Sequence, residues 1–256
     1  MGKPYLSPKK PREGLILYGY RGSIAHNMYV PQSDPDSIDD KDTLGIFIDH
    51  LDNYFGIPKN RNRGVWEKQQ DEWDIVCYEI RKMFSLLLKC NPNVMSLLWL
   101  EDKHYIIKNP EGELLINNRN LFVSKKAYYS FTGYAHGQFK RMTAFKKAGY
   151  MGEKRKQLVE KYGYDCKNAA HLIRLLKMGI EFLSSGVLNV FRYDNDMLLS
   201  IKNGEWSLEK VKNESDRLFK LSEETYLKSK LPENPDVGGA ELLLIDILRN
   251  NFKDKK

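Results

Sequence analysis

Short apolar runs separated by polar loops occupy the first 120 or so residues of the chain. Residues 14–20 (GLILYGY) and 43–49 (TLGIFID) are mainly apolar, and residues 73–78 (WDIVCY) are rich in strand-forming side chains. Each run predicts a buried strand. The third run leads directly into residues 79–90, whose apolar positions recur at helical spacing and predict a helix with one buried face.

The pattern becomes helical from about residue 124. Four segments of helix length, separated by Gly or Pro, follow one another at residues 125–147, 168–186, 208–230 and 239–251. Before them, Asn91-Pro92-Asn93 predicts the end of one helix and the cap of the next. The sequence therefore predicts an α/β (α+β) protein, with an α/β domain over residues 1–120 and a helical domain over residues 121–256.

Composition narrows the class of protein and its partners. Lys and Arg total 41 against 34 Asp and Glu, which gives a net charge of +7 and favours a polyanionic partner without identifying one. The three cysteines, Cys77, Cys90 and Cys166, lack the paired spacing of zinc ligands. With no apolar leader and no long apolar run, the sequence predicts a reduced, cytoplasmic protein that does not span a membrane.

An acid-rich segment follows the first predicted strand and ends at the second. Asp40 and Asp42 are separated by one residue, so in an extended strand their side chains lie on the same side. Two nearby carboxylates repel each other unless a cation binds between them, which predicts a site for Mg²⁺ or Mn²⁺. Upstream, Gly22 allows close approach of the backbone to a phosphate, and the Ser23 hydroxyl is suited to bind the terminal oxygens of a triphosphate.

A third carboxylate is expected on the third predicted strand. Asp74 lies near the start of that strand. Glu79 lies five residues further on, so in a continuous strand its side chain would be on the opposite face. We favour Asp74 and leave Glu79 as the alternative. Each element alone is typical of a turn or a solvated loop, but together they supply three carboxylates for chemistry with two metal ions about 4 Å apart.

One polar stripe crosses an otherwise apolar helical segment. Lys167, His171 and Arg174 recur at steps of four and three residues, and Glu181 extends the stripe. Buried cations need anionic partners, because an unpaired buried charge is costly. Internal salt bridges are one interpretation; we prefer a second, in which these side chains neutralise a nucleotide triphosphate.

The order of these residues resembles that of the nucleotidyltransferases of the DNA polymerase beta superfamily, and specifically a branch found in bacteria and phages near RNA-repair genes. That superfamily has a Gly-Ser turn, an Asp-x-Asp pair and a later acidic residue, matched here by Gly22-Ser23, Asp40-x-Asp42 and Asp74. Ala25-His26-Asn27 partly matches the continuation of the turn. Further similar blocks lie at residues 78–99, 130–142, 164–186 and 231–236.

The resemblance also leaves a choice between two acidic pairs. Asp34-x-Asp36 fits the interval that the superfamily has after its Gly-Ser turn better than Asp40-x-Asp42 does. We prefer the second pair because it adjoins the apolar strand, whereas Asp34 and Asp36 flank Pro35 in what reads as an inserted loop.

The resemblance implies a nucleotidyltransferase-type mixed sheet with flanking helices, and an activity. A nucleoside monophosphate would pass from an NTP such as ATP to an acceptor hydroxyl, with release of pyrophosphate. The implied catalytic and metal-binding residues are Asp40, Asp42 and Asp74, and the implied nucleotide-binding residues are Gly22, Ser23, Lys167, His171 and Arg174. The acceptor implied is an RNA or tRNA end. A protein side chain, as in NMPylation, a small molecule, and an inactive relative that binds RNA or protein stay open.

Overall fold

The computed structural model describes residues 12–31, 33–34, 37, 39–55, 64–143 and 153–253. These residues divide into two compact units. The first, here called the sheet unit, comprises the described parts of Met1–Ala25, Asp40–Val123 and Asn234–Lys256. The second, called the helical unit, comprises those of His26–Asp39 and Ser124–Glu233.

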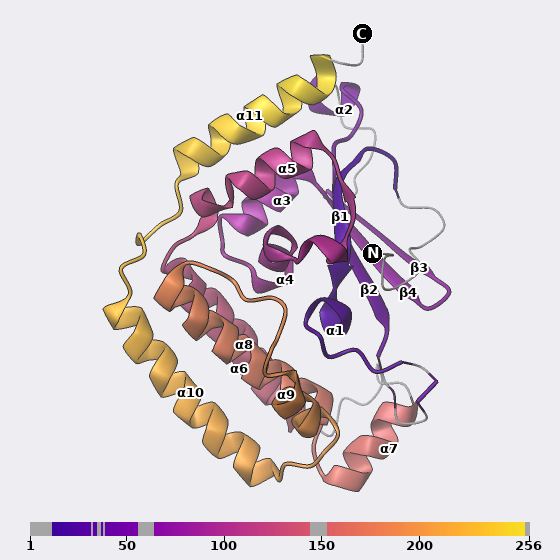
Figure 1. Ribbon diagram of the computed structural model, residues 1–256, viewed down its shortest axis with the longest axis vertical. Helices are drawn as coiled ribbons and strands as arrows, with labels where there is room; N and C mark the ends of the chain where they lie inside the picture. The colour runs from indigo at the N-terminus through magenta and orange to yellow at the C-terminus, as the bar shows by residue number, and fades with distance from the viewer. Residues whose placement is uncertain are drawn as a thin grey trace. The chain divides into compact units, whose positions relative to one another are not determined.

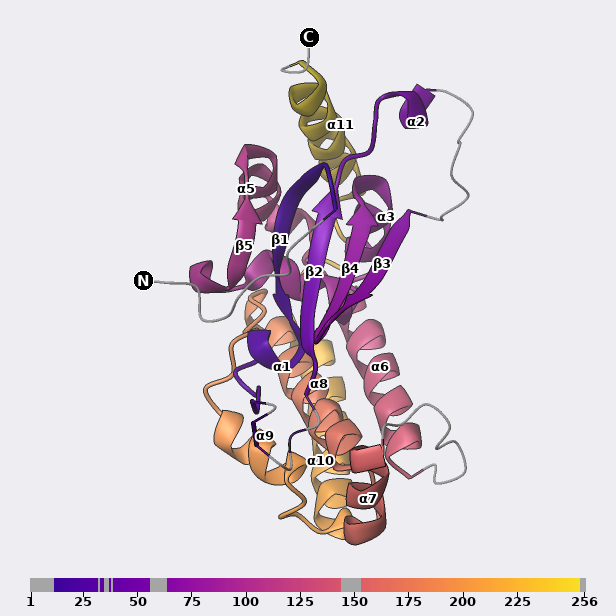
Figure 2. The ribbon, with the colours of Figure 1, turned by 90° about the vertical axis from the view of Figure 1, so that its right-hand side faces the viewer.

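A five-stranded mixed sheet forms the centre of the sheet unit (Figure 2). Its strands are β1 (Leu15–Arg21), β2 (Lys41–Phe47), β3 (Val65–Gln70), β4 (Trp73–Glu79) and β5 (Tyr105–Lys108), in the spatial order β3-β4-β2-β1-β5. The β1 strand is antiparallel to both β2 and β5, β2 is parallel to β4, and β3 is antiparallel to β4. The carboxyl end of β1 therefore lies beside the amino ends of β2 and β4, at one end of the three central strands.

The three strands predicted from apolar runs are the three central strands. The runs are apolar because β1, β2 and β4 are covered on both sides, as their nearly continuous burial shows. The two strands that the pattern did not indicate are at the sheet edges. The β3 strand is largely exposed and polar, and β5 has only 4 residues, so neither carries a strong hydrophobic signal.

Helices flank this sheet. In chain order they are α1 (Gly22–Ala25), α2 (Asp52–Phe55), α3 (Ile80–Leu87), α4 (Pro92–Met95), α5 (Pro110–Asn117) and α11 (Val237–Lys253), with 3-10 turns at η1 (Ser96–Trp99), η2 (Asp102–His104) and η3 (Arg119–Phe122). The Asn91 side chain accepts a hydrogen bond from the Asn93 backbone and caps α4, as predicted. Helix α11 packs against α3 and α5 (Figure 1).

The helical unit is built around α8 (Cys166–Ser185), against which α6 (Lys126–Met142), α9 (Asn195–Lys202) and α10 (Leu208–Lys228) pack. Asp165 caps the amino end of α8 by accepting a hydrogen bond from the Asn168 backbone. Gly186 ends the helix in the left-handed conformation, with φ of 74°. Helices α7 (Glu153–Tyr162) and α9 were not predicted from the sequence.

The predicted fold class is confirmed: a mixed sheet with flanking helices is combined with a helical region. The chain passes from the sheet unit to the helical unit between Val123 and Ser124, near the predicted boundary at residue 120. Helix α11, expected in the helical domain, belongs to the sheet unit, and the described part of residues 26–39, expected in the α/β domain, belongs to the helical unit. The functional division into two domains stays a prediction. No helix of the described chain is long and apolar enough to cross a bilayer.

Candidate functional site

The turn at Gly22 follows β1 directly and adjoins the side chain of Asp42. Gly22 has a φ of +62°, a backbone conformation that favours glycine. A Cβ atom at this position would contact the Asp42 carboxylate, with the Asp42 Cγ only 3.1 Å away. The backbone conformation and the approach of Asp42 therefore both favour glycine here. Ser23 follows in the first turn of α1 and is half-buried.

Two of the predicted carboxylates lie next to each other near the amino ends of β2 and β4. Asp42 of β2 and Asp74 of β4 are direct partners in the parallel register. Arg21, the last residue of β1, pairs with Asp42 across the antiparallel ladder. Its Nη2 lies 3.2 Å from Asp74 Oδ2 and 3.6 Å from Asp42 Oδ1. One guanidinium thus partly neutralises both carboxylates.

A buried side-chain hydrogen bond beside this pair joins β1 to β2. The Tyr18 hydroxyl of β1 donates to Thr43 Oγ1 of β2 at 2.8 Å, and both side chains are fully buried. Burial raises the pKa of Tyr18 well above its usual value, so its hydroxyl remains a donor at any physiological pH. Because Thr43 follows Asp42 directly, this bond restrains the strand that carries the Asp42 carboxylate.

Asp40 lies outside the pair. It is exposed and precedes the first residue of β2. Across the described residues, no group of three or more His, Cys, Asp or Glu side chains is arranged to bind a metal ion. The structure thus brings together Asp42 and Asp74 of the three predicted ligands, and a site with all three stays a prediction.

The alternative acidic residues occupy different positions. Glu79 ends β4, at the opposite end of the strand from Asp74, and caps α3. It accepts hydrogen bonds from the Lys82 backbone at 3.3 Å and the Tyr54 hydroxyl at 2.8 Å. Asp34 is an exposed residue of the helical unit, and Asp36 lies outside the described residues. Within the parallel register Glu79 pairs with Phe47, so it does not lie beside Asp42.

The donor set of this pair suits a hard divalent cation. Carboxylate oxygens are the protein ligands that Mg²⁺ prefers, and one or two of them commonly bind it together with substrate phosphates. Asp42 and Asp74 meet that description, and their approach to the Arg21 guanidinium shows that the location attracts positive charge. The residues present therefore fit the metal that the superfamily resemblance implies.

The cationic stripe lies on α8, in the helical unit. Lys167, His171 and Arg174 are all half-buried there. Lys167 Nζ lies 3.9 Å from Asp39 Oδ1, and the buried Lys202 also forms an ion pair with Asp39. One carboxylate thus faces two ammonium groups in this part of the stripe.

Among the described residues, Arg174 has no carboxylate as a hydrogen-bond or ion-pair partner. Arg174 Nη1 lies 2.7 Å from His26 Nε2 and 3.3 Å from Met178 Sδ, while its Nε has no hydrogen-bond partner among the described residues. Burial and the Arg192 guanidinium lower the pKa of Arg174 to about 9, so it stays charged at neutral pH. Burial, Arg174 and Lys167 lower the pKa of His171 well below 6.5, which keeps it neutral there.

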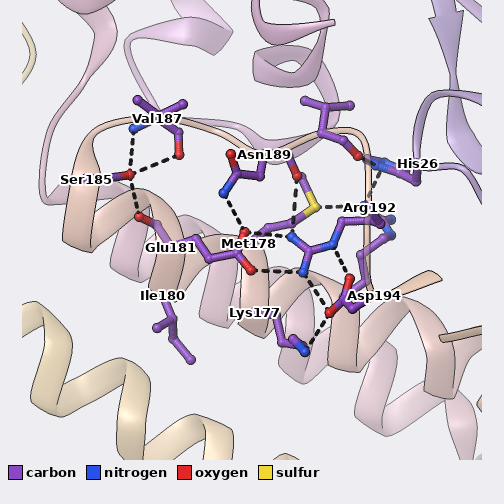
Figure 3. A network of polar contacts seen from close by, with 12 residues as sticks. His26, Lys177, Met178, Ile180, Glu181, Ser185, Val187, Asn189, Arg192 and Asp194 are labelled. Atoms are coloured by element: carbon purple, nitrogen blue, oxygen red, sulfur yellow. Dashed lines mark hydrogen bonds and ion pairs between the residues drawn. The ribbon is translucent and has the colours of Figure 1, made fainter. Parts of the chain in front are cut away.

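The other end of α8 is fully neutralised (Figure 3). Arg192, only 4% exposed, donates to Glu181 Oε1 and Oε2 at 2.9 and 2.7 Å and to Asp194 Oδ1 and Oδ2 at 2.8 and 2.9 Å. Lys177 adds an ion pair of 2.5 Å with Asp194. Internal salt bridging, the alternative interpretation of the stripe, therefore describes Glu181 and, in part, Lys167, but not Arg174.

Sequence reasoning missed three residues that shape these two clusters. Arg21 was overlooked although it directly precedes the Gly22 turn. Asp39 was passed over in favour of its neighbours, and only its pairing with two lysines from distant segments distinguishes it. His26 was noted only as part of a motif, because its contact with Arg174 spans 148 residues of sequence.

The sequence profile of the RNA repair pathway DNA polymerase beta family matches residues 16–212, more than half of the 256-residue chain. The chain belongs to this family. The matched range includes every residue of both clusters and confirms the resemblance to the DNA polymerase beta superfamily. Searches of curated proteins and of solved structures found no match.

Proposed function

We propose that the protein is a metal-dependent nucleotidyltransferase that moves a nucleoside monophosphate from an NTP to an acceptor hydroxyl. The observation that carries this proposal is the register of Asp42 and Asp74 on adjacent parallel strands, with Gly22 directly against Asp42. Membership of the DNA polymerase beta family supports the same reaction class. Asp40 is retained as a third ligand because it precedes β2 at the parity of Asp42.

The reaction follows from the chemistry of phosphoanhydrides. The acceptor oxygen forms a bond to the α-phosphorus, the bond from that phosphorus to the bridging oxygen breaks, and pyrophosphate leaves with the electron pair. Asp42, Asp74 and Asp40 would hold Mg²⁺ or Mn²⁺, which lowers the pKa of the attacking hydroxyl and neutralises the leaving pyrophosphate. Asp74 would lie nearest the acceptor hydroxyl, and the proton would pass to its carboxylate or to water.

The remaining nucleotide contacts would come from the turn and from the helical unit. Gly22 and Ser23 would bind the β- and γ-phosphates through backbone N–H groups and the hydroxyl. Lys167 and Arg174 would neutralise the triphosphate, and neutral His171 would donate a hydrogen bond to it or to the acceptor. Arg174 supports this assignment best, because it is a charged side chain whose guanidinium contacts a histidine and a thioether.

The acceptor that we propose is an RNA or tRNA end, in the cytoplasm. The family description names an RNA repair pathway, and the net charge of +7 favours a polyanionic substrate. Transfer to a protein side chain or to a small molecule would use the same nucleotide site and would differ only in the fraction that becomes labelled.

A labelling experiment tests the proposal. The protein is incubated with each of the four NTPs labelled at the α-phosphate, with Mg²⁺ or Mn²⁺ and either total RNA or lysate. Wild type should label one fraction and release pyrophosphate, whereas Asp42→Asn and Asp74→Asn should not. Glu67→Gln, which removes an exposed carboxylate from β3 of the same unit, is the matched control. Equal labelling by Asp42→Asn and wild type would exclude the proposed site.

A catalytically inactive relative that binds RNA or protein is the second candidate. It is favoured by the contact of Arg21 with both carboxylates, since an arginine in that position supplies the positive charge without any metal. This candidate predicts that RNA binding persists in Asp42→Asn and that no pyrophosphate forms in wild type with any NTP. Release of pyrophosphate by wild type but not by Asp42→Asn would exclude the inactive relative.

A further inference from the structure

A chain of polar contacts connects the neutralised end of α8 to Arg174. Arg192 is clamped by Glu181 and Asp194, as Figure 3 shows. Two backbone carbonyl groups of the segment that carries Arg192 accept hydrogen bonds. Val190 O accepts from His26 Nδ1 at 2.9 Å, and Arg192 O accepts from the Asn27 side chain at 3.2 Å. The clamp therefore fixes the segment that in turn fixes His26.

The partners of His26 define its protonation. Its Nδ1 faces a carbonyl oxygen, which can only accept, so Nδ1 carries the hydrogen. Its Nε2 faces a guanidinium N–H of Arg174, which can only donate, so Nε2 presents a lone pair. His26 is thus a neutral imidazole in one tautomer. It is 6% exposed, so water does not compete freely for either bond.

A neutral acceptor has a different effect on an arginine from that of a carboxylate. The two carboxylates around Arg192 bind four of its N–H groups and cancel its charge. The single hydrogen bond that Arg174 donates to His26 restrains the orientation of its guanidinium and leaves its positive charge intact. An arginine fixed in this way is prepared for a bidentate contact with a phosphate.

We propose that His26 is a positioning residue that orients Arg174 for binding the phosphates of the nucleotide. The inference rests on the proposed function, in which Arg174 contacts the triphosphate, and adds the residue that aligns it. His26 itself would not touch the substrate, because both of its ring nitrogens are already engaged within the helical unit.

Two substitutions separate the two hydrogen bonds of His26. The amide of His26→Gln reaches the position of Nε2 and supplies an acceptor to Arg174. The shorter amide of His26→Asn reaches the position of Nδ1, donates to Val190 O, and leaves Arg174 without its acceptor. Arg174→Gln removes the guanidinium, and Arg217→Gln, on the exposed surface of α10, is the control for lost positive charge.

The measurement is the dissociation constant of the full chain for inorganic tripolyphosphate and for ATP, with thermal unfolding to check folding. Arg174→Gln should weaken the binding of both ligands by well over tenfold. His26→Asn should weaken it by about tenfold, the scale of a lost hydrogen bond to a charged group, and His26→Gln by no more than about threefold. In labelling assays, His26→Asn should raise the KM for NTP and leave kcat nearly unchanged.

The outcomes separate the two proposals. Wild-type binding by His26→Asn, with binding lost in Arg174→Gln, would overturn only the role of His26. Equal loss in His26→Asn and His26→Gln would also overturn it, because the acceptor would then be irrelevant. Wild-type binding by Arg174→Gln, or no binding by wild type, would overturn the role of Arg174 as well. The labelling assay with Asp42→Asn tests the carboxylate pair independently.

Discussion

The carboxylate pair of the sheet unit and the cationic stripe of the helical unit are opposite in charge, and they are built by opposite means. In the sheet unit, two carboxylates share a single guanidinium, Arg21. In the helical unit, Lys167 and Lys202 share a single carboxylate, Asp39, and Arg174 has a neutral imidazole. Among these contacts, carboxylates outnumber cations in the first region, and cations outnumber carboxylates in the second.

A third region shows what complete neutralisation looks like in the same chain. Arg192 is matched by Glu181 and Asp194, and burial is compatible with its charge only because both carboxylates are bound bidentately. Arg192 is therefore a residue that holds the fold together, whereas Asp42, Asp74 and Arg174 are the residues for which we propose a ligand. Under the proposed function, the carboxylate pair would suit a divalent cation, and the cationic stripe would suit an anion.

The largest effect should come from the negative region. Asp42→Asn removes a charge beside Gly22 and leaves the side-chain size unchanged, so the fold should persist while label transfer falls by at least about 10³-fold, or about 4 kcal/mol of transition-state stabilisation. Initial rates of pyrophosphate release measure it. Asp40→Asn tests the third predicted ligand: an equal loss of rate would place Asp40 with the pair, and wild-type rates would exclude it from the site.

The fully neutralised region should respond through stability. Arg192→Met leaves Glu181 and Asp194 without their buried partner, and should lower the free energy of unfolding by about 3 kcal/mol. Urea denaturation of the purified chain measures it, with Arg217→Met of the exposed pair with Glu214 as a control that should match wild type. A change in Arg192→Met no larger than in the control would contradict the structural role of the clamp.

The sequence was informative where a signal is local. The central strands, α8 and the Asn91 cap follow from apolar periodicity and helix-capping residues, and Gly22-Ser23 with Asp42 follows from a motif. The contacts of Arg21, Asp39 and His26 were not accessible, because each depends on the register of strands or on partners far along the chain. Polar side chains at an edge strand such as β3 likewise carry no periodic signal.

Arg21 offers a test of whether the negative region accepts a cation. Arg21→Gln removes the shared positive charge, so Asp42 and Asp74 should repel and the metal-free protein should lose about 1 kcal/mol of stability. Millimolar Mg²⁺ should then raise the Tm of the variant more than that of wild type. Arg81→Gln, which contacts the single carboxylate Glu79, is the matched control and should show no such gain. Equal Mg²⁺ effects on all three proteins would place the metal elsewhere.

The smallest effect concerns the positive region, through the neutral His171. Its pKa is held well below 6.5 by burial and by Arg174 and Lys167, whereas in the unfolded chain it returns to about 6.5. As pH falls below that value the unfolded state binds a proton that the folded state does not, so stability should decline with acid. His171→Gln cannot titrate, so its Tm should fall less than that of wild type between pH 7 and pH 5. Parallel Tm curves for the two proteins would show that His171 is protonated in the folded state. The surroundings of His171 would then be less positive than the structure indicates.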